Sequence, residues 1–326
     1  MSLTMSLDRL AQLDAQARFM LAGQAYERGE VRLVSRDLAG CEHLAATRHG
    51  LFAINPAAYR RIAHGLFYGV TILGDMIYVF EAGDRPRHRT NRGRIVRFRR
   101  DGDTIYAAEV IATGLDNGCH QIDVMHGELH VLDTYNQQII VLSLDGAVRR
   151  VLHPLPLAAD RSGADYVHIN SLLRCADDTL LLLHNGGRPD APRSEVARFD
   201  GDWNLVVRTE VDGHGCHNIA LLEDGTLLCC GSQAGELIGS NGVKVKLGDM
   251  MTRGLSVGVG EILVGGSTFS PRDIRDEKGG TIYFLDRAYR LTSTLAMPAP
   301  VMEIRRIDGR DRSLSHHIAG QLPQAK

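Results

Sequence analysis

The sequence has no excess of charge of either sign. Its 37 Lys and Arg residues and 39 Asp and Glu residues leave a net charge of −2, and no block of like charge stands out. A protein that binds nucleic acid or an anionic membrane surface usually carries a basic patch. We therefore expect neither nucleic acid nor a membrane among its partners.

Long apolar runs are absent as well. No segment approaches the roughly 20 apolar residues of a membrane span. The N-terminus, MSLTMSLDRL, reaches charged residues at Asp8 and Arg9 without the apolar stretch of a secretion signal. These features predict a cytoplasmic protein.

The sequence also lacks the common motifs of metal and phosphate sites. It has no phosphate-binding loop, dinucleotide fingerprint or HExxH helix. The spacing GxSxG occurs as GLSVG (254–258), but within an expected inner strand and not at a strand-to-helix turn, so it is not a nucleophile elbow. Six cysteines occur without the CxxC spacing of a zinc ribbon, and we expect them to be reduced and buried as small apolar residues. They are Cys41, Cys119, Cys175, Cys216, Cys229 and Cys230.

One segment has the three- and four-residue spacing of a helix. Between residues 7 and 28 the apolar positions alternate with Asp, Arg and Gln in this way. They are Leu7, Leu10, Leu13, Ala17 and Met20. We predict an amphipathic N-terminal helix, within a lead-in of residues 1–32, that packs on the outside of the main body.

From about residue 40 the pattern changes to short runs rich in Val, Ile, Leu and Tyr, separated by Gly-containing turns. These runs repeat as a module of four strands. The copies span residues 67–112, 119–154, 168–211, 216–249 and 253–297. Repeats of this kind are typical of an all-β fold in which four-stranded blades surround a central channel, a β-propeller.

The number of blades depends on the two ends of the repeat region. CEHLAATRHG (41–50) is similar to the start of the 119–154 copy and predicts a sixth inner strand, while PVMEIRRIDG (300–309) supplies one spare strand. A composite blade that joins both ends would remove the open sheet edge. We predict a six-bladed β-propeller over residues 33–310, with five blades as the alternative, followed by a polar tail over residues 311–326.

Histidines recur where the inner strands begin. With the second strand of each module as the anchor, the equivalent first-strand residues are His43, Tyr68, His120, Asn170, His217 and Arg253. His168 lies two residues before Asn170, on the same face of that strand. Because inner strands of all blades meet at one axis, these side chains are expected to converge.

Several imidazoles at one axis suit a divalent metal ion. We predict His120, His168 and His217 as ligands, with His43 as a fourth. Zn or Fe is expected before Mn, Cu or Ca. A neutral hydrogen-bonding cluster without a metal, catalytic or ligand-binding, and a purely structural use of the histidines are the alternatives.

Other side chains at the same end of the channel are candidates for chemistry. The loops after the second strands should open on the same face of the propeller as the starts of the inner strands. Asp133 and His184, which lie at such loops, are therefore further candidates. Tyr68 or His184 would serve as acid or base, and Arg253 would bind an anionic group.

Three further segments carry weaker signals. The basic loop at residues 84–94 is expected to be solvated, with phosphate or carboxylate binding as the alternative. The insertion at residues 270–280 is a candidate lid over the channel mouth. His316 and His317 lie in the polar tail and are expected to have no role.

Three inner strands begin with the related segments CHQI (119–122), HIN (168–170) and CHNI (216–219). On these segments and on the blade period, residues 40–305 resemble the broad group of NHL-type, gluconolactonase-like and propeller-lyase proteins. In that group, peptidyl-amidoglycolate lyase holds zinc with histidines from several blades. The resemblance implies that His120, His168 and His217 match those positions. The calcium-binding set of gluconolactonase-like enzymes is not found here.

These observations predict a metal-dependent lyase or hydrolase that acts on a small polar molecule at the channel mouth. The alternative is a non-catalytic propeller that binds a sugar, a small ligand or a protein partner on the same face. A WD-type scaffold is disfavoured because Trp-Asp dipeptides are missing and Trp203 is the single tryptophan. The substrate and the oligomeric state stay open.

Overall fold

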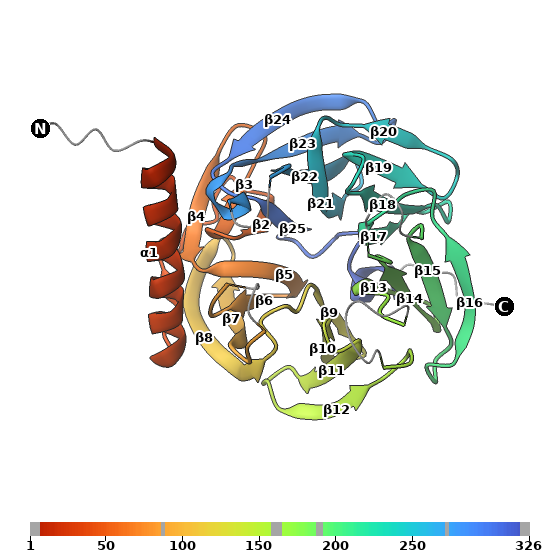
Figure 1. Cartoon of the computed structure of the whole chain (residues 1–326), viewed down its shortest axis with the longest axis horizontal. Helices are drawn as coiled ribbons and strands as arrows, with labels where there is room; N and C mark the ends of the chain where they lie inside the picture. Colours follow the sequence, from red (N-terminus) through yellow and green to blue (C-terminus); the bar gives the residue numbers. More distant parts are fainter. Residues whose placement is uncertain (1–6, 86–88, 158–164, 187–191, 271–273, 320–326) are drawn as a thin grey trace, which may run out of the picture.

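The computed structural model describes residues 7–85, 89–157, 165–186, 192–270 and 274–319. The chain forms a six-bladed β-propeller with an N-terminal helix outside the ring (Figure 1). This confirms the fold and the larger of the two predicted blade numbers. No described helix is long and apolar enough to cross a membrane.

Five blades are each built from four consecutive antiparallel strands. The first two are β5–β8 (Leu66–Leu73, Met76–Ala82, Gly93–Asp101, Thr104–Leu115) and β9–β12 (Ile122–Met125, Glu128–Asp133, Gln138–Ser143, Val148–Leu152). The next two are β13–β16 (Ile169–Cys175, Asp178–Leu183, Glu195–Phe199, Leu205–Glu210) and β17–β20 (His217–Leu221, Leu227–Gly231, Glu236–Gly239, Lys244–Lys246). The fifth is β21–β24 (Met250–Val257, Glu261–Thr268, Gly280–Asp286, Leu291–Met297).

The sixth blade joins the two ends of the repeat region. Its strands are β1 (Arg32–Leu33), β2 (His43–Thr47), β3 (Gly50–Ile54), β4 (Tyr59–His64) and β25 (Val301–Arg306), in the order β1-β4-β3-β2-β25. The inner strand is therefore β25, and the prediction that residues 41–50 form an inner strand is wrong. Because β2 pairs antiparallel with β25, it runs in the direction opposite to the inner strands.

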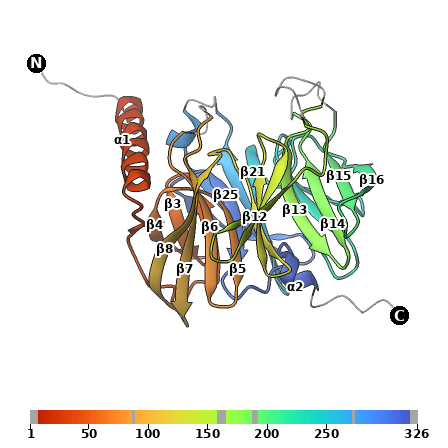
Figure 2. The same cartoon turned by 90° about the horizontal axis from the view of Figure 1, so that it is seen from below.

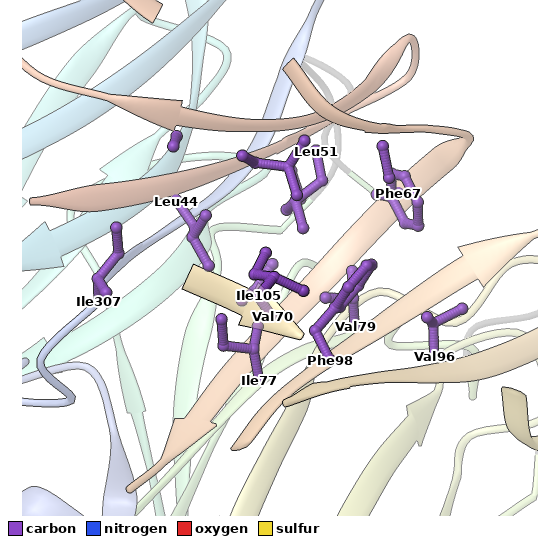
Figure 3. Packing of buried hydrophobic residues seen from close by; sticks show 14 of the residues in the cluster. Leu44, Leu51, Phe67, Val70, Ile77, Val79, Val96, Phe98, Ile105 and Ile307 are labelled. Carbon is purple, nitrogen blue, oxygen red and sulfur yellow. The ribbon is translucent and has the colours of Figure 1, made fainter. Parts of the chain in front are cut away.

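The inner strands β5, β9, β13, β17, β21 and β25 close the ring. Each contacts the next in this order, and β25 contacts β5. Apolar side chains fill the spaces between neighbouring blades. Between the composite blade and the β5–β8 blade, Leu44 and Leu51 pack with Phe67, Val79 and Phe98, all fully buried (Figure 3). This interdigitation fixes how the blades are placed around the axis.

Helix α1 (Leu7–Glu27) lies outside the propeller, beside β4 and β8 in Figure 1. Its buried face consists of the small residues Ala15, Ala22 and Ala25. Most of the apolar positions that the sequence singled out for packing are exposed, with 45% of Leu10 and 60% of Met20 accessible. That part of the prediction is wrong, because the small residues allow a closer approach to the blade than leucines would.

Residues 311–319 pack against the propeller rather than forming a solvated tail. Asp311 accepts hydrogen bonds from Ser256 Oγ (2.6 Å) and Val257 N (3.0 Å), and Ser315 N donates to Asp123 (2.9 Å). The helix α2 (Ser315–Ala319), which contains His316 and His317, lies at the lower edge of the propeller in Figure 2. This segment covers the ends of inner strands β9, β13 and β21. These ends lie on the face of the propeller opposite to the face where the inner strands start with histidines.

Candidate functional site

Four histidine rings meet where the inner strands begin. The ring centroids of His120 and His168 lie 5.0 Å apart, those of His168 and His184 4.6 Å, and those of His184 and His217 4.9 Å. His120 and His217 lie 6.3 Å apart and close the group. We call these four residues the histidine cluster. Two rings belong to the β13–β16 blade and one to each of its neighbours, as the strand register predicts.

His217 is the most buried member of the cluster, and its environment fixes its tautomer. Its Nδ1 lies 2.7 Å from Ser232 Oγ and 2.8 Å from the Gly215 carbonyl oxygen. The Ser232 hydroxyl donates to the Thr252 carbonyl (2.5 Å), so Ser232 Oγ accepts the hydrogen bond from His217 Nδ1–H. Burial, with the nearby Arg253 cation, holds the pKa of His217 well below its usual value. The neutral ring carries its proton on Nδ1 and a lone pair on Nε2.

The buried Nε2 of His217 has no hydrogen-bond partner among the residues that the structure describes. His120 is held in a similar way, since its Nδ1 lies 2.7 Å from the carbonyl oxygen of Gly118. Both residues lie in a Gly-Cys-His sequence, and both cysteine side chains are buried. Alternation along the strand turns the cysteine into the blade and the histidine toward the axis.

A small cavity of about 10 Å³ lies beside the cluster on the axis, which is room for about one water molecule. All six blades contribute to it. It is lined by Tyr68, His120, Gln121, Asn170, Ser171, His217, Asn218, Arg253, Met302 and Glu303. Like His217 Nε2, the buried atoms Tyr68 Oη and Asn170 Nδ2 have no hydrogen-bond partner among the described residues. Burial raises the pKa of Tyr68, so its hydroxyl keeps its proton and can donate.

Glu303, which the sequence reasoning missed, forms part of this cavity. It lies on β25, its side chain is buried, and its Oε1 accepts hydrogen bonds from Asn218 (2.9 Å) and Arg305 (2.6 Å). Burial raises the pKa of Glu303 to about 8, although the Arg305 charge opposes this. A carboxyl group with such a pKa can exchange a proton near neutral pH. Aligning 300–309 as an inner strand would have revealed this residue.

Arg48 is a second residue that the sequence reasoning missed. It follows β2, and its guanidinium lies 5.7 Å from the centroid of the Tyr68 ring. It forms an ion pair with Asp276 in the short helix η1 (Arg275–Glu277). Arg48 reaches this face because β2 runs opposite to the inner strands, so its end and not its start lies at the channel mouth. Arg48 and Arg253 both act electrostatically on Tyr68.

For the same reason, the structure does not bring His43 to the histidine cluster. His43 starts β2 and pairs in register with Arg306, near the end of β25. Its Nε2 lies 3.5 Å from Glu261 Oε1, and Arg306 donates to that same oxygen at 2.7 Å. The expected fourth ligand therefore lies near the opposite end of the inner strands.

Spacing of the ligand atoms is a further test of the predicted metal site. A metal site needs three or more His, Cys, Asp or Glu side chains whose ligand atoms lie close together. Among the residues that the structure describes, one group has all its ligand atoms within 4.8 Å of one another, and it consists of Glu42, His43 and Glu261. The trio His120, His168 and His217 does not reach this spacing in the present side-chain conformations.

Two of the three segments with weaker signals, the loop 84–94 and the insertion 270–280, are placed partly by the structure. In the loop 84–94, residues 86–88 lie outside the described residues. Arg89 pairs with the buried Asp116, and Arg94 is itself buried against Glu81. In the insertion 270–280, residues 271–273 lie outside the described part, while η1 contacts α1 and supports Arg48.

No protein-family model matches the sequence, and no curated protein matches it. Solved structures match at the level of the fold. A protein of unknown function from Bacteroides caccae is 12% identical with a TM-score of 0.54, covering 82% of this chain and 99% of that chain. A nidogen/laminin complex gives 11% identity and a TM-score of 0.58, covering 82% of this chain and 98% of that chain.

A streptogramin B lyase structure also matches, with 13% identity, a TM-score of 0.47, and coverage of 83% of this chain and 74% of that chain. The two matches with TM-scores of 0.54 and 0.58 show the propeller fold alone and say nothing about activity.

Proposed function

We propose that this propeller is an enzyme, a lyase or hydrolase, that acts on a small polar molecule at the channel mouth. The observation that carries the proposal is the state of His217. It is buried and neutral, its Nδ1–H is fixed by Ser232 and Gly215, and its Nε2 lone pair has no partner among the described residues. A lone pair held this way is suited to accept a proton or to bind a metal ion.

The groups around His217 complete a reactive site. Tyr68 Oη and Asn170 Nδ2 are positioned to donate to an oxygen atom in the axial cavity, where charge would develop during elimination or hydrolysis. Arg253, which lines the axial cavity, favours a substrate that carries an anionic group such as a carboxylate. Glu303 supplies a second group that can exchange a proton.

We further propose a divalent metal ion as the cofactor, with His120, His168 and His217 as ligands. His120 and His217 each donate Nδ1–H to a backbone carbonyl oxygen, as metal-binding histidines commonly do. The spacing of the trio requires at least one imidazole to turn before all three bind one ion. When bound, the ion would polarise a substrate carbonyl or lower the pKa of a water molecule.

A metal-free enzyme is the second candidate, and the present spacing of the trio favours it. Here His217 Nε2 removes the proton directly, while Tyr68 and Asn170 stabilise the oxyanion that forms. The two candidates share the same residues and differ in what His217 Nε2 binds.

Elemental mass spectrometry of the purified protein separates them. We expect near-stoichiometric Zn, Fe or another divalent metal in the wild type, and its loss in His120→Ala and His217→Ala. His126→Ala, at the exposed turn between β9 and β10, is the matched control and should keep the metal. Loss in His43→Ala alone would assign the metal to the Glu42, His43 and Glu261 group instead.

No metal in the wild type, even after reconstitution, would overturn the metal-dependent form of the proposal. A turnover screen of small carboxylate-bearing molecules, with His217→Ala as the blank, then tests the enzyme itself. Turnover that survives equally in His217→Ala would refute the role of this residue. Binding without turnover would favour the non-catalytic alternative.

A further inference from the structure

A cleft of about 560 Å³ opens between the β5–β8 and β9–β12 blades, next to the histidine cluster. Its volume is within the range of small-molecule binding sites. Among the described residues it is lined by Arg89, Asn91, Gly114, Leu115, Asp116, Asp133, Tyr135, Asn136, Gln138, Ile140, His153, Leu157 and Tyr166. We call it the inter-blade cleft.

Asp133 orients two amides at the wall of this cleft. The carboxylate is buried, and its Oδ2 accepts hydrogen bonds from Asn136 Nδ2 (2.6 Å) and Gln138 Nε2 (2.7 Å). Since each NH2 group is directed at Asp133, each amide oxygen is left to accept a hydrogen bond from a ligand. Two acceptors held in fixed positions suit a ligand rich in hydroxyl groups.

The charges at the cleft are largely compensated within the protein. Arg89 Nε donates to Asp116 Oδ2 at 2.9 Å, so the two opposite charges compensate each other. The other N–H groups of the Arg89 guanidinium remain as donors for a ligand. Burial raises the pKa of Asp133, and its Oδ2 already accepts hydrogen bonds from the two amides. The cleft therefore favours a neutral polar group over a highly charged one.

Two tyrosines connect the cleft with the histidine cluster. The Tyr135 ring lies 6.4 Å from the His120 ring, and Tyr166 Oη lies 3.2 Å from His168 Nδ1. Tyr135 packs on the backbone at Gly118, where a Cβ would lie 1.9 Å from the Tyr135 ring. Aromatic rings beside hydrogen-bonding groups match a ligand with both an apolar face and hydroxyl edges.

We propose that the inter-blade cleft binds a sugar or a similar ring-shaped polyhydroxylated group, and that this group is part of the molecule acted on at the histidine cluster. The binding itself does not depend on catalysis, whereas the identification of the bound group as substrate rests on the proposed function. The amide oxygens and Arg89 bind the hydroxyls, Tyr135 packs against the ring, and Tyr166 lies between the ring and His168.

Saturation-transfer NMR with D-glucose, D-galactose and D-glucuronate at millimolar concentration tests the proposal. We expect at least one of the three to bind the wild type, and binding to weaken at least 5-fold in Tyr135→Ala and in Gln138→Ala. Tyr106→Ala, at a tyrosine with 54% of its surface exposed on the outer strand β8, is the matched control and should bind as the wild type does. A melting curve for each variant verifies folding.

His217→Ala separates this proposal from the proposed function. Sugar binding that persists in His217→Ala would support the cleft independently of catalysis. If the wild type binds the sugar but shows neither metal nor turnover, the cleft proposal stands and the proposed enzyme function fails. Absence of binding of all three sugars up to 50 mM would overturn the cleft proposal. Binding that Tyr135→Ala and Gln138→Ala leave unchanged, or that only His217→Ala removes, would also overturn it.

Discussion

Ser232→Ala should change the tautomer of His217 without touching the channel itself. In the wild type, two acceptors hold the Nδ1 proton, Ser232 Oγ at 2.7 Å and the Gly215 carbonyl at 2.8 Å. Because the Ser232 hydroxyl donates its own proton to Thr252 O, it cannot donate to Nδ1. The substitution removes one acceptor and leaves the other in place.

The expected size of the effect follows from one hydrogen bond. A net contribution of about 0.5–1.5 kcal/mol corresponds to a change of roughly 2- to 12-fold in the ratio of the two neutral tautomers, toward Nε2–H. The free energy of unfolding should fall by about 1–3 kcal/mol, because the buried Thr252 carbonyl loses its hydroxyl donor. If His217 Nε2 binds a metal, its affinity should fall by about 10- to 100-fold.

Long-range ¹H–¹⁵N NMR spectra of protein labelled at histidine measure this ratio, with His217→Ala to assign the signals. We expect the wild type to show a neutral Nδ1–H ring at pH 7, consistent with its lowered pKa. An Nε2–H tautomer in the wild type, or the same ratio in Ser232→Ala, would refute the reasoning that leads from the hydrogen bonds to the lone pair.

Three further results are expected. Burial lowers the pKa of His130 from 6.5 to about 4. The free energy of unfolding is therefore highest above pH 6.5, where His130 is neutral in both states, and should fall by roughly 3 kcal/mol as the pH falls to 4, because the unfolded state takes up the proton first. Urea unfolding between pH 7 and 4 should show a weaker pH dependence in His130→Gln; equal slopes would contradict this. Arg94→Leu should lower the free energy of unfolding by about 3–5 kcal/mol, because it leaves the buried Glu81 carboxylate without its partner 2.8 Å away, and Glu81→Leu in the same chain should restore much of the loss in urea titrations. Equal stability of the single and double variants would argue against a buried charge. Gly118→Ala should displace Tyr135 and weaken sugar binding to the inter-blade cleft, and unchanged binding in NMR would count against the contact.

Much of the architecture was evident from local patterns. Four-strand repeats with Gly turns predicted the blades, and the strand register predicted that His120, His168 and His217 would converge. The expected direction of the loops after the second strands added His184. This succeeded because each blade is a nearly independent hairpin series, so that equivalent positions in the sequence are equivalent positions around the axis.

The same reasoning failed where a contact depends on distant parts of the chain. The similarity of 41–50 to an inner strand placed His43 at the channel, but β25 occupies the inner position and reverses the direction of β2. Arg48 and Glu303 were missed for the same reason. Helix α1 presents its alanines to the propeller instead of its leucines, since the shape of the blade decides which face fits.

The sequence by itself determined the repeat, the strand alternation and the Gly-Cys-His segments that direct His120 and His217 toward the axis. Only the tertiary structure decided which strand closes the ring and which charges compensate one another. It also decided how far apart the ring nitrogens lie and where the inter-blade cleft opens. These properties depend on how separate blades pack, and packing between elements distant in the chain leaves no periodic signal in the sequence.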